Sequence, residues 1–352
     1  MKGDTQTPME RFLTVVSHKE PDRVPLFLFP TLHGARELGM TLNEYFTRAE
    51  NIVEGQLKLR DKYGHDCVTG FFYAAAEVEA WGGEVLRRDD GPFNSGRPII
   101  RKPEQILDLV PPVAADSPCL QESIKATAGL AEKCGADVPI LGVALSPFSL
   151  PVMQMGFGPY LELIHNHPGL FEALMAVNEE FCVDWANAQL QAGATAVVYF
   201  DPVSSTTIIP RELYLTTGLE VAKRTIPRIN GPTGTHFASG HCLKIIPDIM
   251  STGTGVIGVS AEEDLVAIKK ACDGKLTIVG NLNGVEMRRW TPGDAENAVK
   301  TAIAKAGRGG GFILADNHGE IPWQVPEDTL LAVSHAVNTW GRYPLDWIDA
   351  DA

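Results

Sequence analysis

Polar residues stand at the ends of several short apolar segments of this sequence, and their types could support catalysis or metal binding. His318 comes shortly after the apolar segment 312–315, and His236 lies inside another short segment of small and β-branched residues. Asp201 and Asn281 follow two further apolar segments in the same way. Because a parallel barrel builds its active site at the carboxyl ends of its strands, we expect these side chains to meet at one site.

Eight short apolar segments alternate with longer amphipathic segments along the chain, and this alternation predicts a (β/α)8 TIM barrel. We expect a single domain over residues 1–352 with an N-terminal helical extension, because Thr7, Pro8 and Glu10 form the pattern of a capped helix start. The predicted strands are Val24–Phe29, Asp66–Phe72, Pro139–Val143, Thr195–Phe200, Thr233–Phe237, Gly255–Val259, Leu276–Gly280 and Gly311–Ala315.

The remaining segments predict helices and one hairpin-like excursion over residues 84–100, with Asp90 and Gly91 at its turn. A doubly wound sheet would need a glycine-rich turn after the first strand, and residues 32–35 do not provide one. The glycines of 307–311 precede a strand, so they predict a loop rather than a phosphate cradle. The predicted helices are 8–17, 41–63, 120–134, 161–191 with a split near His167, 211–225, 243–251, 265–272, 292–307 and 326–340.

Composition and charge exclude some classes of function. The 352 residues carry a formal net charge of −14, which argues against a nucleic-acid partner because phosphate neutralisation needs a basic face. No apolar run approaches the ~18 residues of a membrane span, and residues 1–11 lack a secretory apolar region, so we expect a cytoplasmic protein without membrane contact. The six cysteines form no C-x-x-C pair, so we expect free thiols.

The residues at the predicted strand ends are rich in metal ligands and acid–base groups. They include no lysine, and the sequence has no G-x-S-x-G motif, which disfavours Schiff-base and acyl-transfer chemistry. The expected roles are catalysis for Asp201, Asn281 and Glu77, and substrate binding for His33, Ser146 and Asn283.

Two histidines on separate strands provide half of a catalytic zinc site, which needs three protein ligands and an open position. We expect His236, His318 and Glu79 to be the three ligands. A hydrogen-bonded core histidine and carboxylates at a helix N-terminus are the structural alternatives for these residues. Other candidates for the third ligand are Glu77, His241 and Cys242, of which the last two could instead cap a helix.

The segment from Pro8 to Pro25 resembles the N-terminal signature of the uroporphyrinogen decarboxylase superfamily, and the resemblance extends over nearly the whole chain. It includes the segments Glu77–Gly83, Phe200–Pro202, Val279–Asn281 and Ala315–Gly319. The resemblance implies a (β/α)8 barrel and one of two activities. One branch decarboxylates uroporphyrinogen without a cofactor, and the other contains zinc-dependent, corrinoid-linked methyltransferases.

Two departures from the family patterns guide the choice between the branches. The decarboxylase branch has an arginine-rich motif after the first strand, whereas the segment Phe29–Arg36 holds a single arginine, which argues against a substrate with eight carboxylates. The Glu-x-Glu segment is similar to the methyltransferase branch. Coenzyme M methyltransferases bind zinc through a His-x-Cys pair and a distant cysteine, but here Ala238 and His318 stand at or beside the cysteine positions.

The resemblance therefore implies a methyltransferase that moves a methyl group between a small substrate and a corrinoid protein. Nitrogen and oxygen ligands suit a zinc ion that polarises an ether or alcohol oxygen better than one that activates a thiol, so we expect a methoxylated aromatic as the donor. The alternatives are a uroporphyrinogen-type decarboxylase and a non-catalytic binder of a corrinoid protein.

Overall fold

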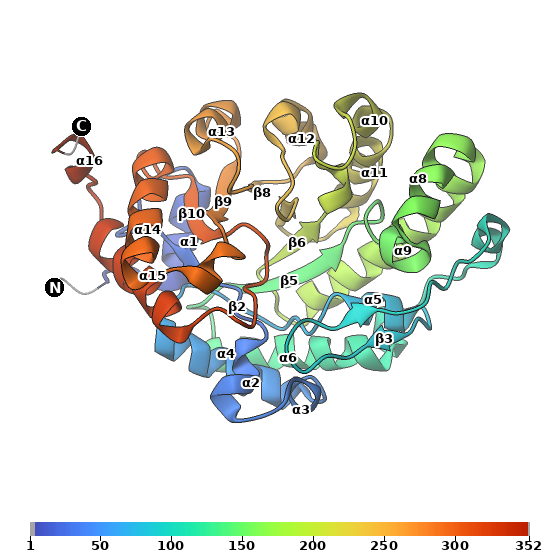
Figure 1. The fold of residues 1–352 in the computed structure, drawn as a ribbon, viewed down its shortest axis with the longest axis horizontal. Coiled ribbons are helices and arrows are strands. Elements are labelled where there is room, and N and C mark those ends of the chain that lie inside the picture. Colours follow the sequence, from blue (N-terminus) through green and yellow to red (C-terminus); the bar gives the residue numbers. More distant parts are fainter. Residues whose placement is uncertain (1–3, 351–352) are drawn as a thin grey trace.

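The computed structural model describes residues 4–350 and contains an eight-stranded parallel sheet that curls around a common axis (Figure 1). The strands follow the order β1-β10-β9-β8-β7-β6-β5-β2. Each strand overlaps one of the predicted segments, so the predicted (β/α)8 barrel is confirmed. The strands are β1 (Leu26–Phe27), β2 (Val68–Thr69), β5 (Ile140–Leu145), β6 (Ala196–Phe200), β7 (Thr233–His236), β8 (Val256–Gly258), β9 (Thr277–Leu282) and β10 (Phe312–Asp316).

Helices surround this sheet, as Figure 1 shows. Within residues 4–350, none of them combines the length and the apolar character that crossing a bilayer requires. The helices are α1 (Pro8–Val16), α2 (His33–Leu38), α3 (Leu42–Tyr45), α4 (Ala49–Tyr63), α5 (Ala75–Ala80), α6 (Pro118–Cys134), α7 (Pro151–Met155), α8 (Phe157–Asn166), α9 (Pro168–Gln191), α10 (Arg211–Thr216), α11 (Gly218–Thr225), α12 (Ile246–Ile249), α13 (Leu265–Cys272), α14 (Pro292–Ala306), α15 (Glu327–Trp340) and α16 (Trp347–Ala350).

Two segments that were predicted as single helices are interrupted. The predicted helix 41–63 is divided into α3 and α4 at Phe46, whose ring packs against Phe93 with centroids 5.4 Å apart and also contacts three other aromatic rings. The predicted helix 211–225 is divided at Thr217, which leaves the helical region with φ −130° and ψ −90°. Tertiary packing therefore overrides a continuous amphipathic pattern at Phe46.

The N-terminal helix α1 packs against β10 and places side chains inside the barrel. The predicted capping box is present, because Thr7 Oγ1 accepts the N–H of Glu10 and the Glu10 carboxylate accepts the N–H of Thr7. Phe12 belongs to the apolar cluster of the barrel interior together with Phe27 and Phe29, and the Phe12 and Phe27 rings stack with centroids 5.7 Å apart. Helix α1 therefore forms part of the floor of the barrel.

The predicted hairpin over residues 84–100 is confirmed as an antiparallel pair, β3 (Val85–Leu86) and β4 (Asn94–Ser95). Its turn reaches the segment after β10, where Gln324 Nε2 donates a hydrogen bond of 2.7 Å to the carbonyl oxygen of Asp90. This contact joins the hairpin to the loop that carries His318.

Candidate active site

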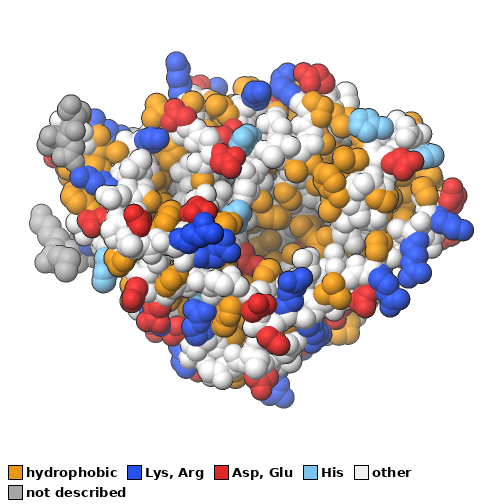
Figure 2. All heavy atoms as spheres, viewed as in Figure 1, with side chains coloured by type: hydrophobic (Ala, Val, Ile, Leu, Met, Phe, Trp, Pro, Cys, Tyr) orange, Lys and Arg blue, Asp and Glu red, His pale blue; other side chains and the backbone are white. Residues whose placement is uncertain are grey.

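A cavity of about 880 Å³ occupies the interior of the barrel. It extends from Leu13 and Val16 of α1 to His318 and Glu320 after β10. Figure 2 shows a hollow at the centre of the molecule that is floored by hydrophobic side chains. Barrel interiors are ordinarily filled by branched side chains in layers, so a cavity of this size needs a local cause.

Small residues on neighbouring strands leave this space. Ala196 on β6, Gly234 on β7 and Gly258 on β8 all line the cavity. Gly258 also makes room for the imidazole of His236, because a Cβ at position 258 would lie 2.2 Å from His236 Cδ2. The sequence of three adjacent strands therefore leaves the barrel partly unfilled and positions the ring of His236.

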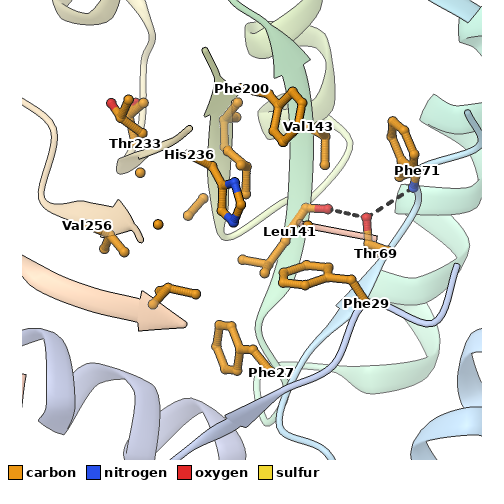
Figure 3. Close-up of a pocket in the computed structure, with 18 of the residues that line it drawn as sticks. Phe27, Phe29, Thr69, Phe71, Leu141, Val143, Phe200, Thr233, His236 and Val256 are labelled. Carbon is orange, nitrogen blue, oxygen red and sulfur yellow. Dashed lines mark hydrogen bonds between the residues drawn. The ribbon is translucent and has the colours of Figure 1, made fainter. Parts of the chain in front are cut away.

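His236, at the end of β7, is buried and points into the cavity (Figure 3). Its ring stacks on Phe200 with centroids 5.5 Å apart and an interplanar angle of 18°. Nδ1 accepts a hydrogen bond of 3.0 Å from the N–H of Ala238, while Nε2 has no hydrogen-bond partner. Burial, together with a smaller effect of His318, lowers the pKa of His236 to about 4. The neutral ring therefore carries its proton on Nε2, where it is available to a ligand.

His318 lines the same cavity from the loop after β10, and its Nδ1 contacts the hydroxyl of Ser239. The carboxylate of Asp316 shapes this loop, because its Oδ2 accepts the N–H groups of His318 at 2.8 Å and of Gly319 at 2.9 Å. Burial lowers the pKa of His318. Both imidazoles are consequently neutral at neutral pH. They face one cavity, and this meeting of the two histidines was predicted from the sequence.

Two carboxyl groups also line the cavity, Glu77 from α5 and Glu320 from the loop after β10. Burial raises the pKa of Glu77 to about 8. The N–H of Leu145, which donates to Oε1 at 2.8 Å, acts in the opposite direction and lowers this pKa. Burial also raises the pKa of Glu320 to about 7, an effect that Asp316 reinforces and the hydroxyl of Thr31 opposes. Carboxyl groups with such pKa values hold a proton near neutral pH and can deliver it to a reacting oxygen.

The cavity is aromatic and contains no fixed positive charge. Phe29, Phe71 and Phe200 line it together with His236 (Figure 3), and Phe93 of the hairpin lines it as well. Among the described residues that line it, none is a lysine or an arginine. This lining suits an uncharged aromatic ligand and provides no ion pair for a polyanion.

Several residues predicted for the site lie outside the lining of the cavity. Asp201 is fully occupied by structural contacts, because its Oδ1 accepts the hydroxyls of Ser146 at 2.6 Å and of Ser149 at 2.7 Å. This network connects the end of β6 to the loop after β5. The N–H of Asp201 donates a hydrogen bond of 2.8 Å to the carbonyl oxygen of His236, but the side chains of Asp201 and Ser146 do not line the cavity.

The side-chain amides of Asn281 and Asn283 form hydrogen bonds with backbone groups. Asn281 Nδ2 donates to the carbonyl oxygen of Ser260 at 2.9 Å, and Asn283 Oδ1 accepts the N–H groups of Val285 and Glu286. Neither side chain lines the cavity. Both amides stabilise loops at the carboxyl ends of strands.

His33 and Glu79 are likewise separated from the two cavity histidines. His33 is buried at the start of α2, where its ring lies 5.9 Å from that of Trp323, and burial lowers its pKa to about 3. Glu79 accepts a hydrogen bond of 2.7 Å from the hydroxyl of Tyr73. Of the two glutamates on α5, only Glu77 lines the cavity.

The residues present do not fit a resident zinc ion held by three protein ligands. Within residues 4–350, no three side chains of His, Cys, Asp or Glu come close enough together to hold a metal ion. A metal-bound histidine normally donates its second ring N–H to a carboxylate or carbonyl, whereas His236 Nδ1 accepts an N–H. The expected ligand set of His236, His318 and Glu79 is therefore not assembled.

We expect the purified chain to contain well below one zinc ion per chain, because two neutral imidazoles without a third ligand bind zinc weakly. Elemental analysis after gel filtration tests this, with His236→Ala and His318→Ala as matched variants. The metal content of all three proteins should be equally low. Stoichiometric zinc in the wild type that disappears in both variants would contradict this expectation.

Sequence reasoning missed Glu320 and Thr31. Glu320 comes two residues after His318, in a loop where side-chain direction cannot be derived from strand alternation. Thr31 follows β1, and its hydroxyl contacts the Glu320 carboxyl. The spacing His-x-Glu was the available signal, because it places two acid–base groups in one short loop.

Comparison with known proteins gives consistent results over most of the chain. The family model for uroporphyrinogen decarboxylase (URO-D) matches residues 7–340. A methylcobamide:CoM methyltransferase of Methanosarcina mazei is 25% identical over 311 residues, covering 84% of this chain and 89% of the relative. A uroporphyrinogen decarboxylase of Magnetococcus marinus is 23% identical over 358 residues, covering 94% of this chain and 96% of the relative.

A solved structure of a methyltransferase from Methanosarcina mazei has the same fold. It superposes with a TM-score of 0.84 at 20% sequence identity and covers 95% of this chain and 99% of that structure. The agreement extends over the whole barrel.

Proposed function

This chain belongs to the uroporphyrinogen decarboxylase family, and we propose that it is a methyltransferase that moves a methyl group between a small substrate and a corrinoid protein. The similarity to methylcobamide:CoM methyltransferases supports the reaction type and the corrinoid partner. We further propose that the methyl donor is a methoxylated aromatic. The observation that carries this choice is the aromatic cavity without a lining lysine or arginine.

The same observation separates the proposed activity from decarboxylation of uroporphyrinogen. A substrate with eight carboxylates loses hydrating water when it binds. Cationic side chains are needed to compensate for the free energy of this desolvation. The lining offers Glu77 and Glu320 instead, and both would repel carboxylates when ionised. An uncharged aryl ether avoids these costs.

The proposed mechanism uses the cavity residues to position the ether and protonate its oxygen. The aromatic ring lies among Phe29, Phe71 and Phe200, and the Nε2–H of His236 donates a hydrogen bond to the ether oxygen. A corrinoid brought by the partner protein would supply the electron pair that takes the methyl group. The bond between the methyl carbon and the oxygen breaks, and the oxygen receives a proton, so that a phenol leaves.

Glu320 is the proposed proton donor in this step. It shares the loop of His318 and contacts Thr31, which fixes the direction of its carboxyl group. Glu77 comes from α5, after β2, and accepts the N–H of Leu145 at the end of β5. We propose that Glu77 is protonated and contacts the ring substituents, because its pKa of about 8 keeps it neutral at pH 7.

The experiment that tests the proposal uses 2-methoxyphenol as donor and free cob(I)alamin as the methyl acceptor. We expect the chain to produce methylcobalamin and catechol in equal amounts, faster than the reaction without protein, as followed by absorbance and chromatography. Heat-denatured chain is the control. Absence of any acceleration over this control, with 2-methoxyphenol and its ring-substituted derivatives, would reject the methyltransferase proposal.

A parallel incubation with uroporphyrinogen tests the alternative activity. We expect its acetate carboxyls to remain intact, because the described cavity lining offers no cation to hold them. Chromatographic detection of decarboxylated porphyrinogens would instead support the decarboxylase.

A further inference from the structure

The lower half of the cavity is not used by the proposed reaction. The histidines and Glu320 lie at the carboxyl ends of the strands, but the cavity continues down the barrel past Ala196 and Val256 to Leu13 of α1. A ligand no larger than 2-methoxyphenol would leave this part unfilled.

The floor of the cavity reaches the surface of the molecule. Leu13 lines it although 54% of this side chain's surface is exposed, and Pro227, Pro232 and Gly253 line it and are exposed as well. The cavity is therefore accessible beside α1 at the amino-terminal ends of the strands, in addition to the mouth that holds the histidines.

The wall of the lower half is apolar because its polar atoms are already paired within the protein. The hydroxyl of Thr69 donates to the carbonyl oxygen of Leu141 at 2.8 Å and accepts the N–H of Phe71 at 3.1 Å (Figure 3). The hydroxyl of Thr195 accepts the N–H of Ile140 at 3.0 Å. These threonines therefore present their methyl groups to a ligand without leaving a polar group unpaired.

The length of this space indicates the size of the occupant. The cavity lining includes both Ala196 and Phe200 of β6, and four steps along a strand cover about 13 Å at roughly 3.3 Å per residue. An aromatic head of about 6 Å leaves about 7 Å of this length, which an extended alkyl chain of roughly five or six carbons would fill.

We propose that the natural ligand is an elongated, uncharged aryl ether whose apolar tail occupies the lower half of the barrel between Ala196, Val256 and Leu13. The identity of the reacting head rests on the proposed function, whereas the position of the tail rests on the cavity alone. The tail enters an unfilled space, so its binding stabilises the complex by removing apolar surface from water without displacing side chains.

Isothermal titration calorimetry of the purified chain with 2-methoxyphenols that carry a para-alkyl chain tests this inference. Burying one methylene group corresponds to about a fourfold decrease in Kd, so we expect Kd to fall by about this factor per carbon. The decrease should stop at roughly six carbons, when the tail reaches the exposed floor. A Kd that is constant beyond the first two carbons would overturn the proposal.

Two variants identify where the tail binds. Ala196→Met fills the lower half, so it should weaken binding of the hexyl compound at least tenfold while leaving the Kd of the methyl compound within about twofold. Leu13→Asp changes an exposed side chain, so the fold should tolerate it, and it should weaken only the long-chain compounds. Equal effects on short and long compounds, or no effect in either variant, would contradict the position of the tail.

The outcomes also separate this inference from the proposed function. Chain-length-dependent binding without any methyl transfer would leave the apolar tunnel established and reject the reaction. Methyl transfer from 2-methoxyphenol, combined with a Kd that does not depend on chain length, would support the reaction and reject the proposed position of the tail.

Discussion

Glu320→Gln should lower the rate of methyl transfer from 2-methoxyphenol by roughly a hundredfold or more, because general acid catalysis typically contributes about 10²–10⁴. Glutamine preserves the size of the side chain and can still accept a hydrogen bond from Thr31, but it has no proton to transfer. The Kd of the ligand, measured by calorimetry, should change little. Full activity in this variant would remove Glu320 from the mechanism.

The pH profile and the choice of leaving group distinguish proton donation from a structural role. The acid must be protonated to act, so the wild-type rate should fall as the pH rises through about 7, the pKa of Glu320. In Glu320→Gln, this fall of the rate with rising pH should be absent. An ether with a nitro group para to the oxygen leaves as a stable phenolate, so its transfer should be much less impaired by the substitution. Glu286→Gln, at an exposed position outside the cavity, is the matched control.

The positions of the strands could be predicted from the sequence because each is a short apolar run flanked by polar residues and glycines. This pattern follows from burial on both faces of a parallel sheet, and it does not depend on detailed packing. The convergence of His236 and His318 followed from the same rule, since the carboxyl ends of barrel strands share one face. Their common cavity confirms that part of the prediction.

The roles of the neighbouring polar residues could not be predicted because adjacent strand positions point to opposite faces. Phe200 lines the cavity, so Asp201, the next residue, points away from it and binds Ser146. On helix α5, Glu77 and Glu79 likewise point in different directions. Residues two apart on a helix lie about 200° apart around its axis, so only one of them can face the cavity.

One fold can support different chemistries, because function depends on the side chains that line a site. The absence of lining lysine and arginine among the described residues, the glycine at position 258 and the small residues of β6–β8 are properties of this sequence rather than of the barrel. Together they make the cavity apolar.

Asp66→Ala should lower the free energy of unfolding by about 3–5 kcal/mol, the typical cost of removing one partner from a buried ion pair. Asp66 is 1% exposed and lies between β1 and β2, the two ends of the strand order. Its Oδ1 accepts Arg11 Nη1 at 2.6 Å and its Oδ2 accepts Arg23 Nη1 at 2.7 Å. The same Oδ2 accepts the N–H of Leu26 at 2.8 Å.

The size of this effect follows from what the substitution leaves behind. Arg11 and Arg23 are both buried, and alanine at position 66 would leave their guanidinium groups with less compensating charge. Arg11 keeps the buried Asp22 at 2.7 Å, whereas Arg23 keeps only the more exposed Asp4 at 3.2 Å, so Arg23 should account for most of the loss. Urea denaturation followed by circular dichroism measures the difference, with Asp61→Ala on the exposed side of α4 as the control. The control should stay within about 0.5 kcal/mol of the wild type. An Asp66→Ala protein as stable as this control would mean that the seam between β1 and β2 is held by apolar packing instead of by the ion pairs.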